Sequence, residues 1–377
     1  MANEDGAAQL RHTPDGYECP DCGAGSVVDC SHPADSPEGR RCFEAWDAAA
    51  DSELAAVDTA AAWPSLAAAW DEPAPEAVLS VAGGGTLAGV GEPCILSGPG
   101  GAGKSSLALC LALAAGEGDG PDGDAGGGLL VRRGRVAVAS YEDAIPRLAG
   151  RARWLAGDPE AWAHVRAWRS PGPLWLASDG GRTSGPGPAW DEWRRGIEGA
   201  SLAVLDPASV AYGANPNDGA AVRAFLHAAA EDAGEAGAGL LILAHDTKAA
   251  RFATGDGPGA GAVSGSGQWH DGARAVLHLG PAMRPDVAAV AVPGGIEGEE
   301  CRILRTAKAN YSRTGGGWLV RPQWEGGNWR GLRIGEALPA GRIRDVDAAA
   351  ARKPKARKGQ NGGTTGARPE GGEVPGV

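Results

Sequence analysis

A glycine-rich octapeptide at residues 98–105, Gly-Pro-Gly-Gly-Ala-Gly-Lys-Ser, constrains the fold of this 377-residue chain more than any other feature. Residues 93–97 before it are mostly apolar, and residues 106–113 after it are good helix formers. The pattern predicts a buried strand, a tight turn and a helix in direct succession. Glycine lets such a turn wrap around an anion with its N–H groups pointing inward, and the helix N-terminus adds positive potential.

The spacing G-x-x-x-x-G-K-S is that of the P-loop, which binds the phosphates of a nucleotide. A glycine-rich turn in a chain with 62 glycines would account for the glycines, but not for the lysine, the serine and the flanking elements together. We therefore expect ATP and Mg²⁺ as cofactors, with Lys104 reaching the β- and γ-phosphates and the Ser105 hydroxyl binding Mg²⁺. The predicted nucleotide contacts are Gly98, Pro99, Gly100, Gly101, Ala102, Gly103, Lys104, Ser105 and Ser106.

Two acidic positions follow predicted strands. Residues 202–205 are apolar and end at Asp206, which is the Walker B pattern and predicts a second Mg²⁺ ligand at the carboxyl edge of a parallel sheet. An ordinary strand with a capping aspartate is the alternative for Asp206. After residues 135–140 comes Glu142, the predicted catalytic base, with Asp143 in support. The alternative for Glu142 is an acid that starts a helix.

His245 ends the strand predicted at residues 239–244. We expect it near the γ-phosphate as a sensor of the nucleotide, and a histidine that merely ends a strand is the alternative. A cation from a neighbouring subunit often completes such a site, and Arg274 and Lys308 are the candidates. An exposed charge without a partner is the alternative for each of them.

Residues 78–335 alternate between strand and helix patterns, which predicts an α/β fold with a mainly parallel sheet flanked by helices. Three later segments, residues 287–292, 301–307 and 317–321, read as antiparallel strands added at the sheet edge.

Residues 1–43 are predicted to be a small cysteine-rich module outside this core. Cys19 and Cys22 form a C-x-x-C knuckle, and with Cys30 and His32 they could hold Zn²⁺. Cys42 is an equal candidate for the second half of the site, and an unstructured arm with free thiols is the alternative. The remaining divisions are an Ala/Pro/Trp linker at 44–77, for which a docked and a loose form are both open, and a disordered basic tail at 336–377.

The formal net charge of −12 gives no global attraction to nucleic acid, so any contact with DNA must be local. Lys248 and Arg251 beside the low-complexity loop 253–267, and the basic cluster at 352–358, are the two places that could supply it. The sequence contains no run of about 18 apolar residues, so we expect no membrane span. The acidic start argues against a signal peptide, and scattered cysteines with a P-loop indicate a reducing, cytoplasmic compartment.

The motifs occur in a specific order over roughly residues 85–320. Those beyond the P-loop are Tyr-Glu-Asp at 141–143, Leu-Asp-Pro at 205–207, His-Asp-Thr-Lys at 245–248, Asp-Gly-Ala-Arg at 271–274 and Lys-Ala-Asn-Tyr at 308–311. This set resembles the RepA-like hexameric helicases of plasmids and phages, within the RecA/DnaB group of ATPases. The resemblance implies a RecA-like fold, a hexameric ring on single-stranded DNA, replication partners, and Arg274 acting across a subunit interface. The chain departs from the wider DnaB group at Lys308-x-Asn310, which lacks a second basic residue.

Two other readings remain open from the sequence. One is a RecA- or RadA-like recombination or repair ATPase, which binds DNA as a filament without unwinding it and whose zinc-knuckle start would suit the cysteine module. The other is an adaptor that hydrolyses nucleotide slowly and is regulated by it. Glu142-Asp143 and the Lys308–Tyr311 segment favour the ring helicase.

Overall fold

A computed structural model describes residues 11–13, 16–18, 36, 40, 73, 75–83, 85–117, 120–178, 181, 183–246, 267–283, 285–292, 301–312, 314–325 and 328–351. The chain divides into two compact units, Met1–Ala74 and Pro75–Val377. In the first unit, β1 (Arg11–Thr13) pairs antiparallel with β2 (Gly16–Glu18). The predicted zinc ligands and almost all of the predicted linker lie outside the described residues.

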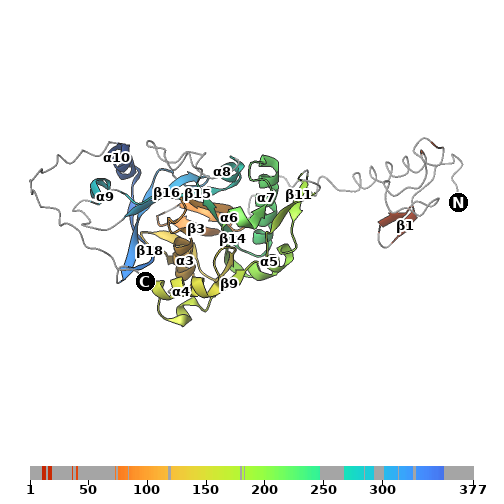
Figure 1. Cartoon of the computed structure of the whole chain (residues 1–377), viewed down its shortest axis with the longest axis horizontal. Coiled ribbons are helices and arrows are strands. Elements are labelled where there is room, and N and C mark those ends of the chain that lie inside the picture. The colour runs from red at the N-terminus through yellow and green to blue at the C-terminus, as the bar shows by residue number, and fades with distance from the viewer. Residues whose placement is uncertain are drawn as a thin grey trace, which may run out of the picture. The chain divides into compact units, whose positions relative to one another are not determined.

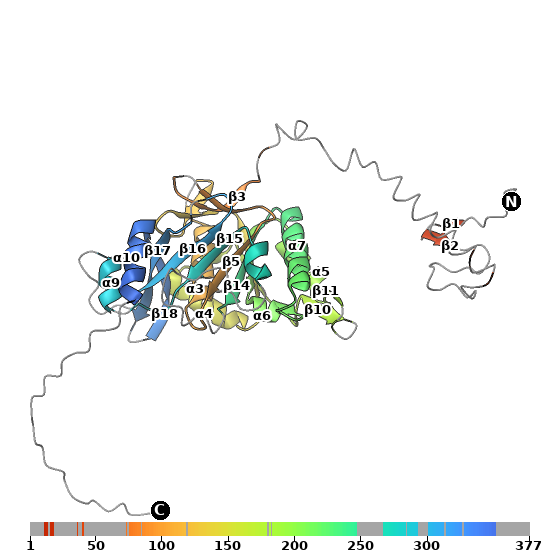
Figure 2. The same cartoon turned by 90° about the horizontal axis from the view of Figure 1, so that it is seen from above.

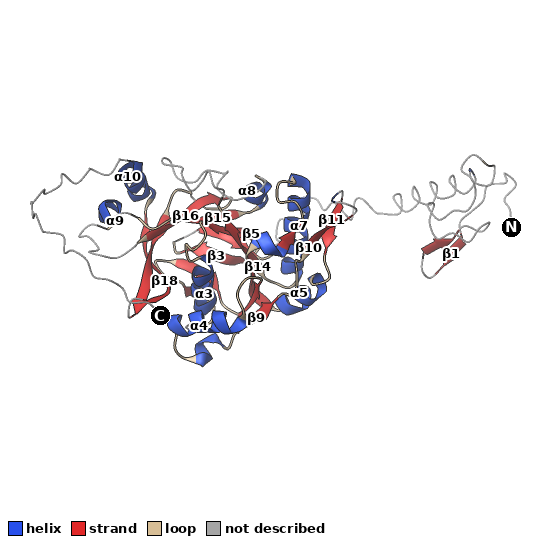
Figure 3. Ribbon diagram, in the orientation of Figure 1, coloured by secondary structure: helices blue, strands red, loops and turns tan. Residues whose placement is uncertain are grey.

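The second unit is built on a mixed sheet that has nine strands among the described residues (Figures 1 and 3). Parallel strands form its centre and one edge, and in spatial order they are β15 (Ala275–Leu279), β5 (Pro93–Gly98), β14 (Gly239–His245), β12 (Ala200–Asp206), β8 (Arg135–Ser140) and β9 (Val165–Arg169). β5, β12 and β14 are buried along nearly their whole length, as expected for parallel strands covered on both faces.

Antiparallel strands complete the sheet beyond β15. They are β16 (Arg302–Ala309), β17 (Gly317–Glu325) and β18 (Asn328–Leu338), each paired with the one before it. The mainly parallel sheet with antiparallel strands at one edge is therefore confirmed.

Helices cover both faces of the sheet (Figure 3). On one face, α3 (Lys104–Ala114) shares a core with a four-stranded antiparallel sheet of β4 (Gly85–Gly89), β3 (Ala77–Val81), β7 (Leu129–Arg132) and β6 (Asp122–Asp124). On the other face lie α5 (Trp190–Ile197), α7 (Gly219–Glu235) and α8 (Gln268–Gly272). The helical period of α5 buries Trp190, Trp193 and Ile197, as its sequence predicts.

Shorter elements connect these layers. They are α4 (Ile145–Leu155), the 3-10 turn η1 (Pro159–Trp162), β10 (Trp175–Ser178), β11 (Thr183–Pro186), α6 (Ala208–Ala211) and β13 (Tyr212–Gly213). An aromatic cluster fastens β10 and β13 to α5, α7 and α8, with ring centroids 5.2–6.3 Å apart and mostly edge-on. None of the helices in the described part of the chain is both long and apolar enough to cross a membrane.

Two predictions about the C-terminal region are wrong. Residues 287–292 are not a strand, because α9 (Pro285–Ala291) occupies them with Val287 and Ala291 on its buried face. The tail is also not disordered from residue 336, because β18 continues to Leu338 and α10 (Ala340–Ala351) follows it. Figure 2 shows α10 beside α9. Ile343 and Val346 of α10 pack against α9 and the sheet, and this burial keeps the segment folded.

Candidate nucleotide-binding site

The P-loop leaves the carboxyl end of β5, in the middle of the sheet, and enters α3. A side chain at Gly98 is excluded, because a Cβ there would lie 2.5 Å from the carbonyl oxygen of Leu279 on the neighbouring strand. Gly103, just before α3, has φ 97°, which L-residues with side chains rarely adopt. The glycines thus let the loop fit closely against β15 and turn directly into the helix.

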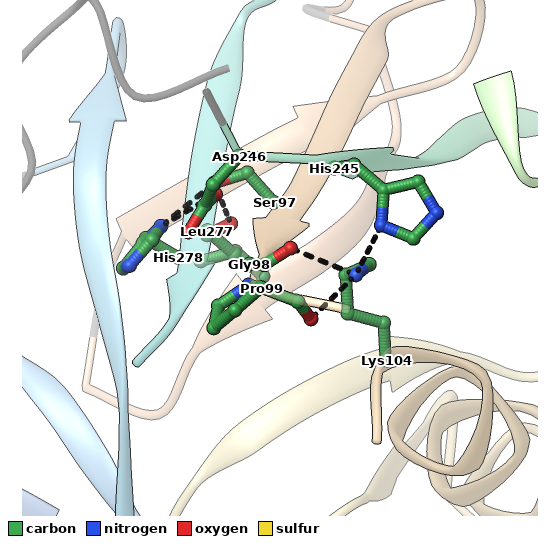
Figure 4. Close-up of polar contacts among 8 residues, drawn as sticks. All are labelled: Ser97, Gly98, Pro99, Lys104, His245, Asp246, Leu277 and His278. Carbon is green, nitrogen blue, oxygen red and sulfur yellow. Dashed lines mark hydrogen bonds and ion pairs between the residues drawn. The ribbon is translucent and has the colours of Figure 1, made fainter. Parts of the chain in front are cut away.

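Lys104 and His245 meet at one side of this loop (Figure 4). The Lys104 ammonium donates hydrogen bonds to Gly98 O at 2.8 Å and to Pro99 O at 3.1 Å, and lies 3.3 Å from His245 Nδ1. β14 pairs with β5 so that His245 lies opposite Gly98. The register therefore brings the predicted sensor against the predicted phosphate-binding lysine.

Asp206 lies at the carboxyl end of β12, beside the start of α3. Burial raises the pKa of Asp206, whereas a hydrogen bond with the Ser105 side chain lowers it, and the nearby Glu142 and Asp143 raise it further. A partly buried carboxylate next to a hydroxyl is the oxygen donor set that Mg²⁺ prefers, and a divalent cation there would stabilise the ionised form of Asp206.

Glu142 and Asp143 follow β8, whose end is joined to β12 by a hydrogen bond from Tyr141 N to Asp206 O at 2.9 Å. Asp143 is held in place, because Arg151 Nη1 lies 2.5 Å from its carboxylate. Its backbone also exchanges hydrogen bonds with the Ser140 hydroxyl. Glu142 is exposed, which leaves this carboxylate accessible to a water molecule in front of the loop.

A cleft of about 470 Å³ gathers these groups. Its lining includes the predicted residues Gly101, Gly103, Lys104, Ser105, Ser106, Glu142, Asp206 and His245. Two arginines that the sequence does not single out, Arg151 from α4 and Arg302 from β16, also line it. Arg274, a predicted catalytic residue, does not line this cleft.

The composition of the cleft fits a nucleotide with Mg²⁺. Lys104 and the loop amides would hold the phosphates, while Ser105 and Asp206 would hold the metal. Ser106 is 1 % exposed, and within the described part of the chain its hydroxyl has no hydrogen-bond partner, so this donor suits a phosphate oxygen. Bound Mg²⁺ would supply charge neutralisation at the phosphates.

A buried polar cluster lies beside the end of β5, on the side facing β15 (Figure 4). His278 Nδ1 is 3.0 Å from the Ser97 hydroxyl and 3.5 Å from Asp246 Oδ1, and each of these residues is at most 5 % exposed. Burial lowers the pKa of His278 to about 4, and the positive charges of Arg305 and Lys104 lower it as well. Because Asp246 N also donates to Gly98 O at 3.3 Å, the cluster ties the end of β14 to the P-loop strand.

Arg274 lies at the opposite, amino edge of the sheet, where its backbone N–H donates to Pro93 O at 2.8 Å. Its side chain is 50 % exposed, and Nε lies 3.7 Å from Oε1 of the buried Glu92. Tyr311 donates a hydrogen bond of 3.0 Å to the same carboxylate oxygen. Lys308, the other predicted finger, instead donates to the carbonyl oxygens of His270 and Asp271 at 3.0 and 2.8 Å, at the end of α8.

The predicted zinc ligands Cys19, Cys22, Cys30 and His32 lie outside the described residues, as do Lys248, Arg251 and the loop at 253–266. Among the residues that the structure does describe, no group of three or more His, Cys, Asp or Glu side chains is placed to hold a metal ion. The zinc site thus stays a prediction.

Comparisons with known proteins agree with a nucleotide-binding role for this cleft. The model of the AAA domain family AAA_25 matches residues 56–251, more than half of the chain, and includes the P-loop, Glu142, Asp206 and His245. None of the curated proteins matches the chain. AAA_25 domains are RecA-like P-loop NTPases, a family that includes RepA- and DnaB-type helicase domains, and such domains use ATP and Mg²⁺. The chain therefore belongs to the AAA_25 family of P-loop ATPases.

Proposed function

We propose that the chain is an ATP-driven DNA motor, a ring-forming replicative helicase that acts on single-stranded DNA. The observation that carries the proposal is the position of Arg274, a half-exposed arginine at the edge of the sheet opposite the P-loop. We propose DNA as the substrate because the order of motifs resembles that of RepA-like helicases.

Arg274 cannot complete the nucleotide site of its own subunit. The five residues of β15 lie between it and the P-loop edge, a span of about 16 Å at roughly 3.3 Å per residue. The Arg274 side chain lies at that edge beside the Glu92 carboxylate, which also accepts a hydrogen bond from Tyr311. Such an arginine is suited to the cleft of a neighbouring subunit, where it would stabilise charge that develops on the transferred phosphoryl group.

The assembly is tested by mixing two inactive variants. Arg274→Ala lacks the arginine but keeps the P-loop, and Lys104→Ala lacks the P-loop lysine but keeps the arginine. If Arg274 acts across an interface, the mixture hydrolyses ATP although each variant alone is nearly inactive, because mixed interfaces contain both groups. A mixture as inactive as its components would exclude this role of Arg274.

The motor activity is tested by comparing ATP turnover with and without single-stranded DNA, and by displacement of a labelled strand from a forked duplex. Glu142→Gln should still bind ATP but lose turnover at least 100-fold, because the general base is removed while the shape of the side chain is kept. DNA-stimulated turnover with rings in electron micrographs supports a helicase. Filaments without strand displacement would instead indicate a recombination-type ATPase.

DNA contact is assigned to two segments outside the described residues. Changing Lys248 and Arg251 to Ala should uncouple turnover from DNA, because these cations enter the loop that would face the channel. Deleting residues 352–377 should lower DNA affinity modestly and flatten its dependence on salt, because the basic tail adds only electrostatic attraction. Loss of all stimulation at saturating DNA after the tail deletion alone would make the tail the primary DNA site.

A further inference from the structure

The register of β16 places Arg302 at the nucleotide cleft. This strand runs antiparallel to β15, and Leu304 pairs with Leu279, the last residue of β15. Arg302 therefore lies beyond that end, at the same sheet edge as the P-loop, and Figure 2 shows β16, β15 and β5 side by side. The cleft lining includes Arg302 together with the P-loop residues.

The alternation of side chains along β16 sets the face on which Arg302 lies. Ile303 is buried with α9 and α10 on one face of the sheet, whereas Leu304 is buried with α3 on the other. Since side chains two residues apart share a face, Arg302 lies on the side of α3, whose first residue is Lys104.

The backbone around Arg302 is firmly held. Cys301 and Ile303 are 0 % and 2 % exposed, and their carbonyl oxygens accept hydrogen bonds from Met283 N at 2.7 Å and from Gly280 N at 2.9 Å. Arg302 itself pairs with Val320 of β17. A side chain on such a strand is better preorganised for a ligand than one on a loop.

The cleft brings together side chains of both charges. Three carboxylates, Glu142, Asp143 and Asp206, face the cations Lys104, Arg151 and Arg302. Hydrolysis of ATP needs positive charge at the transferred phosphoryl group beyond that of the P-loop lysine, and guanidinium binds phosphate oxygens bidentately.

We propose that Arg302 is a further catalytic residue of the ATPase, which contacts the β- and γ-phosphates of the nucleotide bound to its own subunit. A water oxygen forms the new bond to the γ-phosphorus and transfers a proton to Glu142, while the bond to the β–γ bridging oxygen breaks and ADP leaves with that electron pair. Arg302 forms no covalent bond and stabilises the charge on these oxygens. The inference rests on the nucleotide site and not on the proposed DNA motor, so DNA-independent turnover tests it.

The experiment compares Arg302→Ala and Arg302→Lys with Arg321→Ala as a matched control, because Arg321 on the adjacent strand is paired with Glu336. We expect Arg302→Ala to lower kcat by about 1000-fold or more, within the range seen when catalytic arginines are removed. Arg302→Lys should keep part of the rate. A fluorescent ATP analogue should bind more weakly to Arg302→Ala, and binding of the matching ADP analogue should be weakened less, because ADP has only the β-phosphate contact to lose.

Four further outcomes decide the assignment. Turnover by Arg321→Ala should equal that of the wild type, and the thermal unfolding curves of the variants should match the wild-type curve. If Arg302→Ala does not fold, Arg302→Lys is used for the test. Mixing Arg302→Ala with Lys104→Ala should not restore turnover, and restoration would show that Arg302 acts in a neighbouring site. Turnover of both Arg302 variants within twofold of wild type would also overturn the proposal. If Lys104→Ala itself retained turnover, the nucleotide-site assignment would fail instead.

Discussion

His278 is a histidine that the fold keeps neutral, because it is buried beside the end of β5 and its pKa is lowered to about 4. In the unfolded chain the same side chain binds a proton near pH 6.5. The unfolded state therefore binds more protons between these values, and stability is lost as the pH falls from 6.5 toward 4. We expect a loss of roughly 3 kcal/mol over this window, measured by urea unfolding at several pH values.

Two variants separate this contribution from that of other groups. His278→Asn keeps a polar atom near Ser97 but does not titrate, so it should flatten the slope between pH 6.5 and 4. His227→Asn is the matched control, because His227 is 82 % exposed and should leave the slope unchanged. An unaltered slope in His278→Asn would assign the pH dependence to other groups.

Residues of the site differ in how far sequence could identify them. Lys104, Glu142, Asp206 and His245 each follow a predicted strand or a glycine loop directly, and parallel strands deliver such residues to one edge. Arg302 carries no comparable signal, because its place in the cleft depends on the antiparallel pairing of β16 with β15. Sequence periodicity indicates a strand there but not the strand with which it pairs.

Elements at the C-terminal end show the same limit. The apolar run at 287–291 suits either a strand or a helix, and packing against Ile343 and Val346 of α10 favours the helix. Sequence does not predict β18 and α10, because charged residues and glycines interrupt the apolar residues of β18 and those of α10 are mostly alanine. The central strands were predicted well, since a run such as Leu-Leu-Ile-Leu in β14 is buried on both faces.

The hairpin of β17 and β18 completes the core around the P-loop helix. Leu332 is fully buried in the same cluster as Leu107 and Leu111 of α3, and its carbonyl oxygen accepts a hydrogen bond from the Cys110 thiol at 2.9 Å. Burial raises the pKa of Cys110 to about 12, so the thiol stays protonated and can donate. We expect Leu332→Ala to destabilise the protein by about 2–5 kcal/mol, measured by denaturant unfolding.

The neighbouring residue supplies the control for this variant. Arg333 is exposed on the same strand, and Arg333→Ala should change the unfolding free energy by less than about 0.5 kcal/mol. Equal effects of the two substitutions would mean that the hairpin does not contribute to the core through Leu332.

At the scale of the whole molecule, the two compact units make the zinc prediction separable from the ATPase. If Cys19 and Cys22 bind Zn²⁺, the purified protein should contain about one zinc per chain, and Cys19→Ser should lose it. ATP turnover should persist in that variant, because the cleft is built entirely within Pro75–Val377. Metal analysis of a chelator-free preparation checks this, and a preparation without zinc would exclude the site.

The placement of the hairpin also bears on how the protein is made. The P-loop helix is synthesised by residue 114, yet Trp318, Val320, Leu332 and Ile334 of its core come more than 200 residues later. Until they leave the ribosome, one side of that helix remains open to water. Nascent chains of this ATPase therefore expose apolar surface through most of their translation, which is the kind of surface that chaperones recognise.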